Sequence, residues 1–192
     1  QADGALTYDY SRFDRYIEFF EKAGAADMIE LTHVGHFGEG GWSGSEIVLG
    51  RLSATDAQTK ERISLDFDEG LKPFLGALER HLEETGRLKK SAIHVADEPS
   101  INNVESFRKA SAKVREAAPR LRRMDAIETI DFTGALEIWV PKVSHYERWR
   151  DAYEERRGDN QFWFYICCHP VGPHYPNRFV DLPLSNVRVL HW

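Results

Sequence analysis

The stretch SAIHVADEP, residues 91–99, is predicted to be a buried β-strand that ends in two adjacent carboxylates and a proline. Side chains alternate along a strand, so Ile93 and Val95 share one face and His94 lies on the other. One face is therefore apolar and the other mixed, and polar groups follow at the carboxyl end. This pattern is typical of a strand in a barrel of parallel strands surrounded by helices.

Strands and helices alternate on both sides of this segment, which predicts parallel β-α-β units. A hairpin is expected between residues 46–52 and 62–67, after a glycine-rich loop at 35–44. The expected strands are 28–34, 91–96, 123–127, 136–140 and 162–168, and the expected helices are 10–24, 71–86, 102–118, 145–157 and 183 onward.

Two closures suit such units, an open doubly wound sheet and a (β/α)8 TIM-type barrel. The two faces of the later strands differ, with Ile138 and Val140 opposite Trp139, and no glycine-rich phosphate turn follows a strand. These features favour an α/β barrel, with Trp139 on its inner side. A complete barrel takes about 250 residues. The 192 residues are therefore predicted to form a single domain, an incomplete barrel with about five strands.

Composition excludes several classes of protein. There are 31 acidic and 25 basic residues, a net charge of -6, and no basic run longer than two residues, which argues against nucleic-acid binding. No apolar run approaches the length of a membrane span. The two cysteines, Cys167 and Cys168, are adjacent and predict no disulfide framework. The sequence does not fix the compartment, and we expect a secreted or periplasmic location rather than a cytoplasmic one.

The strongest chemical signal is the pair Asp97 and Glu98 at the end of the first quoted strand. Carboxylates this close raise the pKa of at least one member, which then holds a proton at neutral pH. One group can act as a general acid while the other stays ionised. The alternative is structural, with Asp97 capping the turn that precedes the next helix.

At these residues the chain resembles the catalytic domain of glycoside hydrolase family 123, a group of N-acetyl-β-galactosaminidase-like barrels. The resemblance extends in order across nearly the whole chain. Besides the Asp-Glu-Pro motif, it rests on the segments YDYSRFD (8–14), LEIWVP (136–141), FWFYICC (162–168) and PNRFVDLPL (176–184).

The resemblance implies an enzyme that removes β-linked N-acetylhexosamine, with N-acetylgalactosamine as the expected sugar. In such enzymes the acetamido oxygen of the substrate is the nucleophile. Asp97 would position and polarise the acetamido group, and Glu98 would protonate the leaving oxygen. The chain would cover about strands three to seven, so the missing strands would come from the rest of the protein or from a second copy. The fragment alone is expected to be inactive.

Four further residues are candidates for substrate binding: His33, Trp139, Tyr165 and Asn177. Each also has a structural interpretation, as barrel filling for the aromatic rings and as a turn residue for Asn177. We expect no cofactor and no metal, because the spacing of His33 and His36 in a glycine-rich loop is weak evidence for ligands. Two other functions stay open, a non-catalytic carbohydrate-binding barrel and a metal-dependent barrel hydrolase or isomerase.

Overall fold

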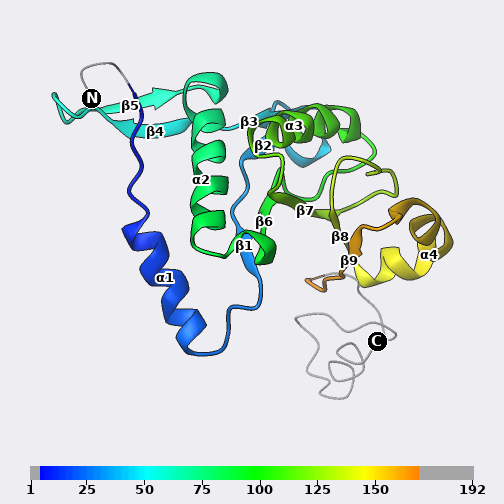
Figure 1. The fold of residues 1–192 in the computed structure, drawn as a ribbon. Coiled ribbons are helices and arrows are strands. Elements are labelled where there is room, and N and C mark those ends of the chain that lie inside the picture. The colour runs from blue at the N-terminus through cyan, green and yellow to red at the C-terminus, as the bar shows by residue number, and fades with distance from the viewer. Residues whose placement is uncertain (1–4, 169–192) are drawn as a thin grey trace.

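Five parallel strands form the sheet on which the fold is built (Figure 1). The structure is a computed structural model that describes residues 5–168. The strands lie side by side in the order in which they occur along the chain. They are β1 (Ile29–Leu31), β6 (Ser91–His94), β7 (Arg122–Ile127), β8 (Ile138–Pro141) and β9 (Gln161–Phe162). The predicted α/β class with parallel strands is confirmed. Within residues 5–168 the sheet is open, and these strands do not close into a barrel.

The helices follow from apolar stripes that the sequence displays. They are α1 (Ser11–Lys22), α2 (Lys72–Glu84), α3 (Val104–Ala117) and α4 (Val143–Arg157). Leu75, Leu78 and Leu82 of α2 recur every three or four residues and are buried, as predicted. None of the helices described in residues 5–168 is long and apolar enough to cross a membrane. The helix predicted from residue 183 lies outside the described residues.

The helices contribute to a hydrophobic core on one face of the sheet. Buried side chains of α2 and α3 pack there with Ile93, Trp139 and Tyr153. A second, smaller cluster holds strand residues with no buried helical partner: Ala92, Met124, Ile138 and Val140. The two clusters correspond to the two faces of the strands, since neighbouring residues in a strand point in opposite directions.

The predicted facing of β8 was wrong. Trp139 is 0% exposed and lies in the helix-side core, where its ring is 6.2–6.3 Å from the rings of Phe132, Tyr153 and Phe162. Its indole N–H donates to the backbone carbonyl of Leu136 at 3.2 Å. The bulky indole occupies the space between strand and helix, whereas the smaller Ile138 and Val140 pack on the opposite face.

The predicted hairpin is confirmed in its second strand, at residues 62–65, and wrong in its first, which is Leu52–Thr55 rather than 46–52. The structure has two antiparallel hairpins, one between β2 (Gly35–Phe37) and β3 (Ile47–Leu49), the other between β4 (Leu52–Thr55) and β5 (Arg62–Leu65). Residues 35–37 were expected to be loop because the segment 35–44 is rich in glycine. Gly35 is needed in the strand, because a Cβ there would lie 2.9 Å from the carbonyl oxygen of Val95. The N–H of Gly35 donates to that same oxygen at 2.7 Å.

The connection between β7 and β8, residues 128–137, contains no helix. Just before β8, the half-buried carboxylate of Glu137 accepts hydrogen bonds from the backbone N–H and the guanidinium of Arg123 in β7. Arg123 is 2% exposed and donates to both carboxylate oxygens of Glu137. Arg123 also bonds Ser111 of α3, so this pair ties α3 to both strands.

Candidate active site

Polar side chains from all five strands gather at the edge of the sheet where the strands end. Parallel strands have their carboxyl ends on the same side, and this is where α/β folds place binding and catalytic groups. Asp125 lies inside β7, two residues before its end, and the other residues lie at or just beyond the strand ends: His33, His94, Asp97, Glu98, Glu128, Lys142 and Tyr165. They form two groups, one around Glu98 and one around Asp125.

The Asp97–Glu98 turn is held in an unusual backbone conformation. Glu98 has a φ of 43°, in the left-handed region that residues other than glycine rarely adopt. Such conformations cost on the order of 1 kcal/mol and persist where the surrounding structure enforces them, often at functional sites. Here the N–H of Glu128 donates to the carbonyl of Pro99 at 3.0 Å and ties the turn to the end of β7.

Glu98 is bonded to a tyrosine from the far edge of the sheet. The hydroxyl of Tyr165 donates to the Glu98 carboxylate and also lies 3.1 Å from Oε1 of Glu128. Burial and the two neighbouring carboxylates raise the pKa of Tyr165 far above its ordinary value, so the hydroxyl keeps its proton. The Glu128 carboxylate is 8% exposed and pairs with the ammonium of Lys142 at 2.6 Å. Lys142 thus balances the charge of Glu128, while the Tyr165 hydroxyl donates to Glu98.

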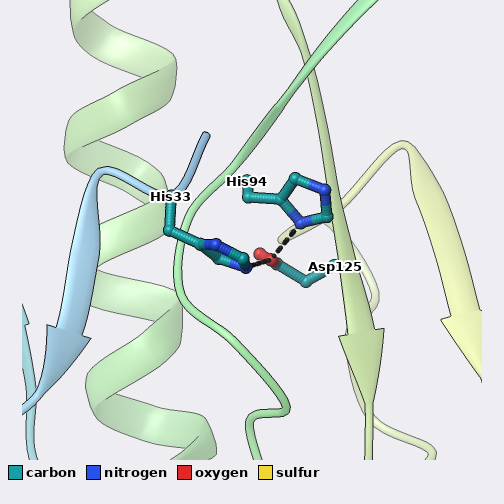
Figure 2. Close-up of side chains that lie close together, drawn as sticks. All are labelled: His33, His94 and Asp125. Carbon is teal, nitrogen blue, oxygen red and sulfur yellow. Dashed lines mark hydrogen bonds and ion pairs between the residues drawn. The ribbon is translucent and has the colours of Figure 1, made fainter. Parts of the chain in front are cut away.

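The second group is built around the fully buried carboxylate of Asp125 (Figure 2). Its Oδ1 lies 2.8 Å from Nδ1 of His94 and 3.6 Å from Nε2 of His33. Its Oδ2 accepts the backbone N–H groups of Val95 at 2.9 Å and Ala96 at 3.3 Å. Asp125 therefore holds both the histidines and the backbone that leads directly into the Asp97–Glu98 turn.

Glu30 completes this second group from β1. Its Oε1 is 2.6 Å from Nε2 of His94, so that both ring nitrogens of this histidine contact carboxylates. Nε2 of His33 also lies 3.9 Å from Oδ1 of Asp97, the member of the pair that is more open to solvent. The two groups of the site therefore meet at the Asp97–Glu98 turn.

Burial and charge shift the titration of these groups in different directions. Burial raises the pKa of Asp125 to about 7, although His94 and the two backbone N–H groups oppose the shift. Burial alone would lower the pKa of His94, but the carboxylates of Asp125 and Glu30 raise it above its ordinary value. Burial and the nearby His94 lower the pKa of His33. These surroundings favour the neutral form of the His33 imidazole.

Comparison with known proteins gives the family of the chain. The sequence model of the glycoside hydrolase 123 catalytic domain matches residues 1–192. The chain belongs to this family. Among solved structures, the family 123 domain is similar to a family 123 glycoside hydrolase from Clostridium perfringens that was studied for its hydrolysis of glycolipid glycans, with a TM-score of 0.60 and 14% identity. The match covers 88% of this chain and 31% of that one. No curated protein sequence matches significantly.

The family 123 domain brings together four of the six residues singled out from its sequence. Asp97, Glu98, His33 and Tyr165 lie at one edge of the sheet and are joined by the contacts above. Trp139 does not join them, because its ring is buried on the helix side and has no exposed surface to offer a sugar. Asn177 lies outside the described residues.

Sequence reasoning about the family 123 domain did not single out five residues of the site: Asp125, Glu128, Lys142, His94 and Glu30. One signal was available for Asp125, because a lone carboxylate within the apolar strand MDAI (124–127) requires a buried partner. Glu128 follows the last residue of the same strand, and Lys142 follows the last residue of β8. Their positions at strand ends were visible, but their pairing across strands was not.

A large groove of the family 123 domain lies beside the site, and Glu30 is the site residue that lines it. It has a volume of about 1040 Å³ and runs between the segment 5–17, β1 and the β4–β5 hairpin. Its lining is mainly apolar and includes Tyr8, Phe13, Leu31 and Phe74. The groove thus follows the open edge of the sheet at β1, and none of Asp97, Glu98 and Tyr165 lines it.

Proposed function

We propose that the chain is part of a glycoside hydrolase that removes β-linked N-acetylhexosamine, with N-acetylgalactosamine as the sugar, by a substrate-assisted retaining mechanism. The observation that carries the proposal is the adjacent pair Asp97 and Glu98 at the carboxyl end of β6, with Glu98 held by Tyr165. Membership of family 123 supports it. Neighbouring carboxylates lie on one side of the sugar, which suits a reaction whose nucleophile comes from the substrate.

The two carboxylates have different surroundings, which suits different roles. Asp97 is 65% exposed at its side chain and can reach a ligand, so it is the group that holds and polarises the acetamido. The acetamido oxygen then attacks C1 and the bond to the leaving oxygen breaks. Glu98 gives its proton to that oxygen and later takes one from the water that reopens the cyclic intermediate. Tyr165 keeps the Glu98 carboxyl in place during both steps.

We also propose that the sheet is part of a (β/α)8 barrel and corresponds to about its third to seventh strands. A doubly wound sheet reverses its strand order so that helices cover both faces. Here the strands follow chain order and the buried helical residues pack on one face. The other face, with Ala92, Met124 and Ile138, would then be the barrel interior. The apolar groove beside β1 suits a preceding strand from the rest of the protein or from a second copy.

Two substitutions test the roles of the pair, in the protein expressed from its complete reading frame. Glu98→Gln should lower turnover about 10²–10⁴-fold on N-acetylhexosaminides with poor leaving groups. It should have a smaller effect on activated aryl glycosides, which need no protonation. Asp97→Asn should lower turnover on both, since the acetamido is no longer positioned. Glu105→Gln, a matched change of an exposed glutamate on α3, should leave turnover unchanged.

Small and equal effects of Glu98→Gln and Asp97→Asn would contradict these roles. Full activity on a glycoside with a 2-hydroxyl in place of the acetamido group would also contradict them, because that substrate has no internal nucleophile.

A further inference from the structure

Three side chains of types that can ligate a metal converge beside the proposed catalytic pair, from three neighbouring strands (Figure 2). His33 follows β1, His94 ends β6 and Asp125 lies in β7. One ligand atom from each lies within 4.8 Å of the other two. The proposed hydrolysis uses Asp97 and Glu98 and has no step for these three groups.

We propose that His33, His94 and Asp125 form a binding site for a divalent metal ion of the zinc class. Two imidazole nitrogens and one carboxylate oxygen are a donor set that zinc accepts in proteins. Bonds of about 2.1 Å place tetrahedral ligand atoms about 3.4 Å apart. The distances from Asp125 Oδ1 are 2.8 Å to Nδ1 of His94 and 3.6 Å to Nε2 of His33, so small side-chain rotations bring all three atoms to a shared ion.

The contacts around His94 match those of a metal ligand. A histidine that binds a metal through one nitrogen usually donates its other N–H to a carboxylate, which fixes the ring. Glu30 occupies that position at Nε2, 2.6 Å away. The ion would replace the proton between Nδ1 of His94 and Oδ1 of Asp125. Oδ2 of Asp125 would stay bonded to the N–H groups of Val95 and Ala96, which already fix the carboxylate.

His33 supplies access to the proposed site. Its side chain is 36% exposed, so the ion can enter from that side. Asp97, whose Oδ1 is 3.9 Å from Nε2 of His33, stands where a fourth ligand would be.

A bound ion would act on Asp97. The cation would attract this carboxylate and compete with its proposed contact to the acetamido group. Zinc should therefore lower hydrolysis rather than support it. This consequence rests on the proposed function, whereas the binding of zinc does not.

Zinc binding is best measured without substrate, by calorimetric titration of zinc chloride into chelator-stripped protein expressed from its complete reading frame. His33→Ala and Asp125→Asn should each weaken binding at the site by at least about 100-fold, because each removes a direct ligand. Glu30→Gln should weaken it by about 10–100-fold, the effect expected of a residue that orients a ligand. His36→Ala removes an exposed histidine three residues from His33 and should change the affinity less than twofold.

Cobalt provides a second readout, since its visible absorption reports the coordination directly. The spectrum should indicate tetrahedral binding in the unaltered protein and His36→Ala, and disappear in His33→Ala. Circular dichroism of each variant identifies loss of folding. If Asp125→Asn fails to fold, the zinc affinity of His33→Ala tests the proposal instead. Absence of zinc binding in the unaltered protein, or equal binding in His33→Ala, overturns the proposal and leaves the roles of Asp97 and Glu98 untouched.

Discussion

The bond between Tyr165 and Glu98 gives a sharp test of the arrangement at the sheet edge. Tyr165→Phe removes one hydroxyl and keeps the ring that packs against the second hydrophobic cluster. Glu128 keeps its pairing with Lys142, so the change acts mainly on Glu98. Glu98 then loses the partner that holds it beneath the leaving oxygen.

The size of the effect follows from the kind of bond that is lost. A hydrogen bond to a charged group contributes about 1.5–3 kcal/mol. At 1.36 kcal/mol for each factor of ten, the loss corresponds to a fall of about 10- to 150-fold in turnover if the whole bond serves the transition state. The fall should appear in kcat more than in KM, because Tyr165 orients the acid and does not bind the sugar in this scheme.

The assay compares kcat and KM on an N-acetylhexosaminide with a poor leaving group and on an activated aryl one. The activated substrate should be less affected, as for Glu98→Gln. Tyr153→Phe is the matched control, since its buried hydroxyl contacts only the carbonyl of Thr129, at 3.4 Å, among the contacts described for it. Turnover within twofold of the unaltered protein in Tyr165→Phe would refute the positioning of Glu98 by this hydroxyl.

Two further outcomes are expected. Glu137→Ala should lower the free energy of unfolding by about 3–5 kcal/mol, measured by urea denaturation, because it leaves the buried Arg123 without its carboxylate. Burial alone would raise the pKa of Glu137, but its bonds to Arg123 lower it below the ordinary value, so this stabilisation should be lost as pH falls through that lowered pKa. Treatment with EDTA should leave hydrolysis unchanged or raise it, and a loss of activity that zinc restores would contradict the proposed metal-free chemistry.

The helices and the order of strands could be predicted because they depend on local patterns. The leucines of α2 indicate which side of the helix is buried, whereas β6 is buried on both faces. The strand predicted at 162–168 is reduced to Gln161–Phe162, with an isolated bridge between Lys142 and Tyr165 beyond it. An apolar run indicates burial, but it does not show how far a strand at the edge of a sheet keeps its pairing.

The facing of Trp139 could not be predicted from alternation alone. The apolar residues Ile138 and Val140 were assigned to the helix side because helices usually cover the more apolar face. In β8 both faces are apolar, and the choice depends on volume, because the indole needs the space next to Tyr153 of α4. Size complementarity between elements distant in sequence is a tertiary property that a single strand does not reveal.

The charged partners at the site were hidden for the same reason, and Asp125 illustrates the consequence. It lies 31 residues beyond His94 in the chain, yet one of its oxygens faces both histidines. The other accepts the N–H groups of Val95 and Ala96, the two residues before Asp97. A proton or a cation on the first oxygen therefore draws charge from the same carboxylate that fixes the backbone of the proposed catalytic turn. The histidine cluster and the Asp97–Glu98 pair are thus coupled through the buried side chain of Asp125. A substitution in either group should therefore alter the geometry of the other.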